Sequence, residues 1–279
     1  MYKRNVVVKT QPKTANNNVR NDLINATQHN LHMKERDKIE LITAPTNGIK
    51  IYESHAGILT SVCICVLIKD TSNIQNMIEN LIKLREIFKK TFIVFVSYNI
   101  DILYKELLSN LENCLLINSS NYSEEFQLRN LYLSFFHENI KMFNLMMVID
   151  PINLYLPINT KSFNFLENLD FTVAFANQSY KYYDIDSLID DYKNGSTITD
   201  PELKKEQQKH ISINNELIPV KSAFGGLAVY KTEVLDIDNK YTTDNHITFN
   251  LKISQKYSKM FIIPSFLVET SPENGHLYL

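Results

Sequence analysis

The sequence predicts an α/β protein with a mostly parallel central sheet flanked by helices. Short apolar runs rich in β-branched and aromatic residues recur between residues 58 and 149. Longer stretches with apolar residues at helical spacing separate these runs. Because neighbouring parallel strands need crossover connections, this alternation favours a parallel sheet with right-handed crossovers.

The first element of the predicted domain is a strand at 58–68, where the sequence is almost continuously apolar. A helix follows, beginning at a capping box of Ser72 and Gln75 and carrying apolar residues at helical spacing from Ile74 to Phe88. Further strands are predicted at 92–96, 114–117 and 145–149, with helices at 100–112 and 123–142 between them. The later segments are less regular: candidate strands or short elements lie at 171–176, 223–230, 247–251 and 260–268, and helix and loop at 187–208.

Two parts of the chain differ in composition. Residues 1–55 are predicted to be a polar N-terminal accessory or flexible segment, because residues 11–30 are polar, rich in Asn and only weakly periodic. Residues 56–279 are predicted to form one α/β domain, which contains every strong strand and helix pattern. The 44% of hydrophobic residues is enough to build its core.

Charge, hydropathy and cysteine content argue against a nucleic-acid-binding, a membrane-spanning and a disulfide-rich protein. The formal net charge of −2 argues against a nucleic-acid-binding protein. The longest apolar runs are far shorter than the roughly 20 residues of a membrane-spanning helix, and the first residues lack a signal-peptide pattern. Three cysteines are too few for a disulfide framework and are expected to be buried thiols in a reducing compartment. We therefore expect a cytoplasmic protein without a membrane span.

Asp150 is the first candidate for function, because it follows the predicted strand at 145–149. Ligands of open α/β sheets bind beyond the carboxyl ends of the strands. A carboxylate at this place can hold a divalent cation, since hard metals take oxygen ligands, and the cation would neutralise the diphosphate of a nucleotide sugar. The alternative is an Asp that starts a turn before Pro151.

Other motifs surround Asp150 in a recognisable order. Arg129 and Asn130 open an RN-x-x-L pattern, and residues 148–153 stand where an acidic D-x-D-D-like motif follows it. Residues 175–185 match an aN…YYD pattern, 222–231 a GFGG-x-x-x-Y pattern and 244–250 a C-E-H-V-x-F-N pattern. From about Ser61 to Asn250, the chain thus resembles GT-A glycosyltransferases related to the fungal capsule mannosyltransferases, and similar proteins of large DNA viruses.

The resemblance implies a GT-A-like, Rossmann-type fold that transfers a sugar from a UDP- or GDP-linked donor to a glycan or protein acceptor. It implies Mn²⁺ or Mg²⁺ held by Asp150 and His246, with Asp244 and Asp184 as catalytic residues. The residues implied for donor or nucleotide binding are Arg129, Asn130, Asp150, Asn153, Gly225 and Gly226, and those for the sugar or acceptor are Asn177 and Tyr183. A viral relative would act in the host cytoplasm, and a homo-oligomer is compatible with the pattern.

Each of these residue types suits its role and has a structural alternative. The planar guanidinium of Arg129 matches phosphate oxygens, but it also forms salt bridges on helix surfaces. Gly225 and Gly226 permit positive φ and close approach to a ligand, or a plain turn between strands. Neutral His246 can ligate Mn²⁺ or contact a phosphate, or it can cap a local turn. Asp244 can act as a general base towards an acceptor hydroxyl.

The chain departs from the family pattern at the acidic motif. Val148 and Pro151 stand where acids are usual, and Asn245 replaces a usual Glu. Fewer carboxylates lower the affinity for a metal, so we expect weak or nucleotide-dependent metal binding. The alternative function is a catalytically weakened GT-A-fold protein that binds nucleotide sugar or glycan, or supports an active partner. A nucleotidyltransferase is less favoured, because residues 68–72 lack the glycines of a phosphate-binding loop.

Overall fold

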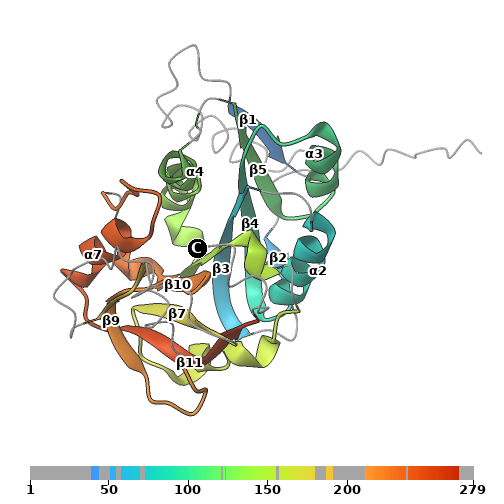
Figure 1. The fold of residues 1–279 in the computed structure, drawn as a ribbon. Coiled ribbons are helices and arrows are strands. Elements are labelled where there is room, and N and C mark those ends of the chain that lie inside the picture. The colour runs from blue at the N-terminus through green and yellow to red at the C-terminus, as the bar shows by residue number, and fades with distance from the viewer. Residues whose placement is uncertain are drawn as a thin grey trace, which may run out of the picture.

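The computed structural model describes most of the chain after residue 38. The described ranges are 39–43, 51–54, 58–69, 73–120, 122, 124–154, 157–179, 187–190, 211–236 and 238–269. In this part, strands run through the centre of the molecule, and helices cover both sides of the sheet (Figure 1). No helix among these residues is both long and apolar enough to cross a membrane.

The strands form one 11-stranded sheet in the order β1-β5-β4-β3-β6-β10-β7-β11-β9-β8, with β2 paired to β4. Their bounds are β1 Ile39–Thr43, β2 Tyr52–Glu53, β3 Ile58–Ile68, β4 Phe88–Tyr98, β5 Cys114–Ser119, β6 Leu145–Ile149, β7 Val173–Gln178, β8 Ile189–Asp190, β9 Ile218–Ser222, β10 Leu227–Lys231 and β11 Met260–Val268. The consecutive strands β5, β4, β3 and β6 are parallel, which confirms the predicted parallel centre. Strand β10 lies antiparallel between β6 and β7, so it begins at the edge where β6 ends.

Helices and apolar residues divide into two layers, one on each face of the sheet. The helices are α2 Ile74–Arg85, α3 Ile102–Ser109, α4 Glu125–Glu138, α5 Phe165–Asn168 and α7 Ile247–Ser254, with short 3₁₀ helices η1 Ile140–Met142, η2 Pro151–Leu154, η3 Thr160–Phe163 and η5 Thr232–Val234. Successive side chains of a strand point to opposite faces. Cys63 and Cys65 of β3 therefore join the core under α4 and α7, whereas Ile64 and Val66 join the core under α2.

Most predicted elements are confirmed, and the differences have physical reasons. Strands β3 and β6 have the predicted bounds, and β11 spans the predicted 260–268. Phe88, which the helical spacing included in the first helix, instead begins β4, where its ring is fully buried. Residues 247–251 form the start of α7 and not a strand, because a helix places Phe249 and Ile253 together on the sheet.

Two strands arise from the segment predicted to be accessory. Strand β1 pairs with β5 and β2 pairs with β4, both antiparallel, so both extend the sheet. The rest of residues 1–55, except 51 and 54, lies outside the described residues. Parts of this segment therefore belong to the α/β sheet, whereas the domain boundary at residue 55 stays a prediction.

Candidate functional site

The carboxyl ends of β3 and β6 bring the first candidate residues to one edge of the sheet. The two strands are parallel neighbours, with Val66 opposite Ile149. Lys69 follows β3 and half-buried Asp150 follows β6, so both side chains start from the same edge. The N–H of Asp150 donates a hydrogen bond to the carbonyl oxygen of Gly226 at 2.9 Å, which joins Asp150 to the turn before β10.

The turn at Gly225 and Gly226 requires glycine. Both residues have positive φ, 63° and 82°, in the left-handed region that a Cβ disfavours. Both are buried, and Leu227 directly after them pairs with Ile149. Gly225 and Gly226 thus form a tight turn next to the end of β6. Because neither residue has a side chain, backbone atoms of this turn border Asp150.

Helix α4 holds the segment of residues 241–244 against this edge. The amide of Asn130 forms two hydrogen bonds with the backbone of Tyr241: its Nδ2 donates to the carbonyl oxygen, and its Oδ1 accepts from the N–H, both at 2.9 Å. Arg129 donates from Nη1 to the carbonyl oxygen of Asp244. In return, Asp244 Oδ1 accepts the N–H of Phe126 at 2.9 Å and so caps the first turn of α4. Arg129 and Asn130 thereby position a distant segment.

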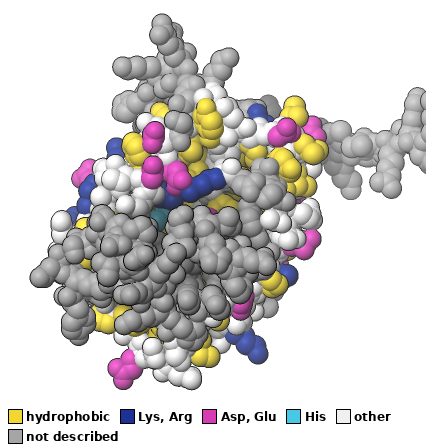
Figure 2. All heavy atoms as spheres, viewed as in Figure 1, with side chains coloured by type: hydrophobic (Ala, Val, Ile, Leu, Met, Phe, Trp, Pro, Cys, Tyr) yellow, Lys and Arg dark blue, Asp and Glu magenta, His cyan; other side chains and the backbone are white. Residues whose placement is uncertain are grey.

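Arg129 is a buried cation in a small network of charges. It is 7% exposed, and its guanidinium lies 3.2 Å from Glu125. Glu125 also pairs with the more exposed Lys69 at 2.5 Å. Burial acts to lower the pKa of Arg129, but nearby tyrosines, Glu125 and Asp150 outweigh it and raise the pKa, which places Asp150 within electrostatic reach. Figure 2 shows basic and acidic side chains side by side over α4, with histidine surface beside them.

His246 completes the cluster and is held from two sides. Its ring stacks on Phe224 with centroids 3.7 Å apart and planes 11° apart, and its Nδ1 lies 3.1 Å from the hydroxyl of Tyr241. Burial, followed by the charges of Arg129 and Lys69, lowers the pKa of His246 well below its ordinary value, so the imidazole is neutral. Although it precedes α7, its side chain makes no capping hydrogen bond.

The same contacts bring His246 to the edge that carries Asp150. Phe224, on which His246 stacks, directly precedes the glycine turn, and this turn accepts the N–H of Asp150. The residues predicted from three separate motifs, Arg129, Asp150 and His246, therefore lie in one region of the molecule. An arrangement with Asp150 and His246 on opposite sides is excluded.

The remaining predicted residues lie elsewhere or outside the described part. Asn177 is fully buried in β7, where its Nδ2 donates to the carbonyl oxygens of Ile211 and Pro264 at 2.9 and 3.0 Å. Its amide therefore joins segments of the chain. Asn153 belongs to η2, but its side chain is outside the described residues, as are Tyr183 and Asp184.

Sequence reasoning did not single out Lys69, Phe224 and Tyr241. Lys69 carried a usable signal, because it follows the predicted strand at 58–68 as Asp150 follows the strand at 145–149. Phe224 is part of the GFGG-like pattern, whereas Tyr241 carried no signal; the positions of both beside His246 arise from pairing between distant segments.

The described side chains do not form a ready-made metal site. No group of three or more His, Cys, Asp or Glu among them is arranged to hold a metal ion. Asp150 offers one carboxylate, and the neighbouring positions of the acidic motif are Val148 and Pro151. Divalent cations of the Mg²⁺ and Mn²⁺ type take several oxygen ligands, so this donor set does not fit a preformed site.

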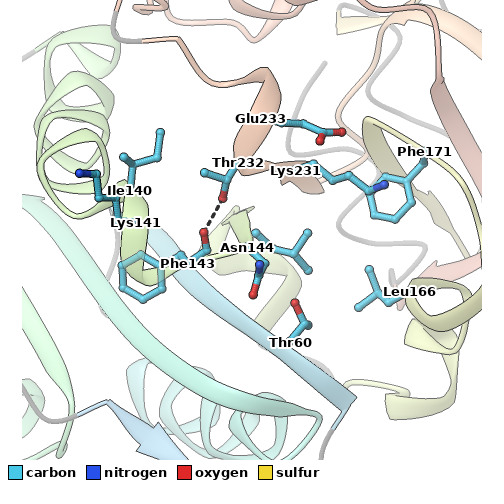
Figure 3. Close-up of a pocket in the computed structure, with 11 residues that line it drawn as sticks. Thr60, Ile140, Lys141, Phe143, Asn144, Leu166, Phe171, Lys231, Thr232 and Glu233 are labelled. Carbon is cyan, nitrogen blue, oxygen red and sulfur yellow. Dashed lines mark hydrogen bonds between the residues drawn. The ribbon is translucent and has the colours of Figure 1, made fainter.

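A separate cavity lies at the opposite ends of β3 and β6, away from Asp150. It has a volume of about 640 Å³ and opens where β3 and β6 begin and β10 ends. Figure 3 shows the Lys231 side chain directed at Phe171 and Thr232 directed at Phe143; Asn144 and Thr60 also line the cavity. Lys231 Nζ lies 5.2 Å from the centre of the Phe171 ring, and Thr232 donates to the carbonyl oxygen of Phe143 at 2.8 Å. None of the residues predicted to bind donor, acceptor or metal lines this cavity.

No family model and no curated protein matches the sequence. Solved structures match distantly. A mannosyltransferase from Pyrobaculum calidifontis, in complex with GDP-Man and Mn²⁺, is 10% identical with a TM-score of 0.46, over 95% of this chain and 70% of that one. A 4-diphosphocytidyl-2C-methyl-D-erythritol synthase from Anaerococcus prevotii is 11% identical with a TM-score of 0.42, over 77% and 91%. Glucosyl-3-phosphoglycerate synthase from Mycobacterium tuberculosis is 8% identical with a TM-score of 0.42, over 75% and 69%. A likeness this distant does not by itself assign an activity.

Proposed function

We propose that this protein is a glycosyltransferase that uses a nucleoside-diphosphate sugar as donor and a glycan or protein as acceptor. The observation that carries the proposal is the convergence of Asp150, the turn at Gly225 and Gly226, and the segment of Asp244 and His246 at the carboxyl edge of β3 and β6. This is the edge at which open α/β sheets bind ligands. The motif resemblance to GT-A glycosyltransferases supports the reaction class.

The residues at this edge suit a diphosphate that leaves with negative charge. Stabilisation of that charge by fixed polar groups is the main catalytic effect available to such a site. Lys69, with 43% of its side chain exposed, supplies an accessible cation, and the buried Arg129 shares its partner Glu125. The glycine turn lets a ligand approach the backbone closely, because no Cβ intervenes.

Asp244 would deprotonate the acceptor hydroxyl. It is exposed, and its Oδ1 accepts the N–H of Phe126, which fixes the carboxylate at the edge. Asp150 would orient the donor or its sugar through hydrogen bonds to hydroxyl groups. Because the described side chains do not fit a preformed metal site, the proposed metal binding is weak and dependent on the nucleotide.

A thermal-shift screen of UDP- and GDP-sugars, with Mn²⁺ or with EDTA, tests the proposal. A donor that binds the native state raises the melting temperature by mass action. We expect Asp150→Ala to remove the shift, or its metal-dependent part, without loss of the fold. Asp170→Ala is the matched control, since Asp170 pairs with Lys259 away from this edge and should leave the shift intact. A metal-dependent shift that survives in Asp150→Ala would exclude Asp150 from the site.

A catalytically weakened binding protein is the second candidate, and one observation favours it. The described residues lack a cluster of acids for a metal, and Val148 and Pro151 occupy acidic positions of the motif. Release of nucleoside diphosphate from the donor that shifts the melting temperature separates the two functions. Turnover supports the transferase, whereas binding without release or transfer supports the weakened protein.

A further inference from the structure

His246 has a buried nitrogen whose partner is missing from the described part of the chain. The side chain is 3% exposed, and its Nε2 makes no hydrogen bond with any described residue. Leaving a buried polar atom without a partner costs about 1–3 kcal/mol, so such atoms in folded proteins call for an explanation. A ligand at the neighbouring edge would supply the missing partner.

The contact with Tyr241 decides which imidazole nitrogen carries the proton. Neutral imidazole has one N–H and one lone pair, and the nitrogen 3.1 Å from the Tyr241 hydroxyl is Nδ1. A phenol O–H is a much stronger acid than the N–H of neutral imidazole, and the imidazole lone pair is a good acceptor. Tyr241 therefore donates to Nδ1, and the imidazole proton resides on Nε2.

Tyr241 is rigid enough to impose this choice. Its backbone is held by the two hydrogen bonds to Asn130, and its ring stacks on Phe249 at 4.4 Å with planes 9° apart. The His246 ring is confined between Phe224 and Tyr241. A fixed hydroxyl beside a fixed ring selects one tautomer, because the hydrogen bond made by one ring nitrogen decides which nitrogen carries the proton.

An Nε2 that carries a proton has no lone pair for a metal ion. It is a hydrogen-bond donor, and the cations nearby, Lys69 and Arg129, favour the approach of an anion. The absence of a metal-binding cluster among the described side chains agrees with this chemistry. We propose that Tyr241 holds His246 as the Nε2–H tautomer, and that Nε2–H donates to a phosphate oxygen of a nucleoside diphosphate instead of ligating a metal ion. The identity of this anion rests on the proposed function; the tautomer does not.

The tautomer can be read in the ligand-free protein. Long-range ¹H–¹⁵N spectra of ¹⁵N-histidine-labelled protein distinguish the two neutral forms, and His246→Gln identifies the signal among the seven histidines. We expect the Nε2–H form in the wild type and a mixture in Tyr241→Phe. Tyr257→Phe is the matched control, because the Tyr257 hydroxyl donates to the carbonyl oxygen of Glu233 at 3.0 Å and should leave the signal unchanged. An Nδ1–H form in the wild type would overturn the proposal.

Calorimetric titration with UDP and GDP, in EDTA and in Mn²⁺, tests the phosphate contact. We expect one diphosphate to bind in EDTA, and His246→Phe to weaken it about tenfold, the equivalent of one hydrogen bond to a charged group. His246→Gln keeps an N–H donor and should lose less. Binding that requires Mn²⁺ and falls equally in both variants would overturn the contact but leave the proposed function standing. If neither diphosphate binds the wild type, the proposed function and the contact both fail, whereas the tautomer is still decided by the spectra.

Discussion

The two ends of β6 carry polar groups that are held in very different ways. At the Asp150 end, Arg129, Tyr241 and His246 are buried and joined by hydrogen bonds and ring stacking. At the Leu145 end, a cavity of about 640 Å³ is bordered by exposed Lys141, Asn144 and Glu233. The residues around this cavity are thus less firmly held than those at the Asp150 end. The Asp150 end is the candidate site because its polar groups are already held in place, and not because of its volume. A ligand that binds to groups already held in place loses less free energy to fixing side chains.

The sheet topology explains this asymmetry. At the Asp150 end, the parallel strands β3 and β6 end and the antiparallel β10 begins, so side chains from three segments meet a tight glycine turn. Helix α4 then fastens the 241–244 segment across the same edge. At the other end, the short helices η1 and η5 border the opening. We therefore expect equivalent substitutions at the two ends of β6 to lower the free energy of unfolding by different amounts.

The largest difference is expected between Arg129→Met and Lys231→Met. Arg129→Met removes the donor to the partly buried carbonyl oxygen of Asp244 and the buried cation that pairs with Glu125, and should lower the free energy of unfolding by about 3 kcal/mol. Lys231 contributes mainly a contact with the Phe171 ring, so its loss should cost less than about 1 kcal/mol. Urea denaturation of both variants measures the difference. Equal losses would show that the two ends are held equally firmly.

Asn130→Ala and Asn144→Ala compare the two ends of β6 with the same substitution. Asn130 makes two hydrogen bonds to the backbone of Tyr241, and we expect its loss to cost about 2 kcal/mol. Asn144 is exposed and its Oδ1 accepts from Ser61, so about 1 kcal/mol is expected. Asn130→Ala should also weaken nucleotide binding, because the Tyr241–His246 segment loosens, whereas Asn144→Ala should not. Denaturation and calorimetric titration report the two effects; a binding defect in Asn144→Ala alone would move the site to the cavity.

The smallest effect is expected in the pH dependence of stability. The pKa of His246 is lowered by burial and by Arg129 and Lys69, so the native side chain stays neutral where the unfolded one takes up a proton. Below the ordinary histidine pKa of about 6.5, the free energy of unfolding should therefore decrease as the pH is lowered. The decrease is at most about 1.4 kcal/mol per pH unit and ends once the pH passes the native pKa. His246→Gln should lack this part of the loss. His137, whose pKa is also lowered, contributes to both proteins and cancels. If the free energy of unfolding of the wild type and of His246→Gln depends on pH in the same way, His246 is not held neutral.

Local patterns were sufficient for the regular part of the fold. The apolar runs of β3 and β6 and the position of Asp150 after β6 follow from sequence alone, because buried parallel strands need continuous apolar residues. The helix of residues 247–254 was missed, since a short apolar run has no unique period. Strands β1 and β2 were missed because they are only five and two residues long, too short for a clear periodic pattern.

What the sequence determined by itself was the class of fold, the edge at which we propose that a ligand binds, and several of the residues that meet there. These properties depend on periodicity and on strand ends, which are local. Only the tertiary structure decided that Arg129 and Asn130 hold the segment of Tyr241 and Asp244, that Asn177 is enclosed in the sheet, and that Tyr241 faces His246. These contacts join residues far apart in the chain, and their partners are selected by packing and hydrogen-bond geometry, which no local pattern encodes.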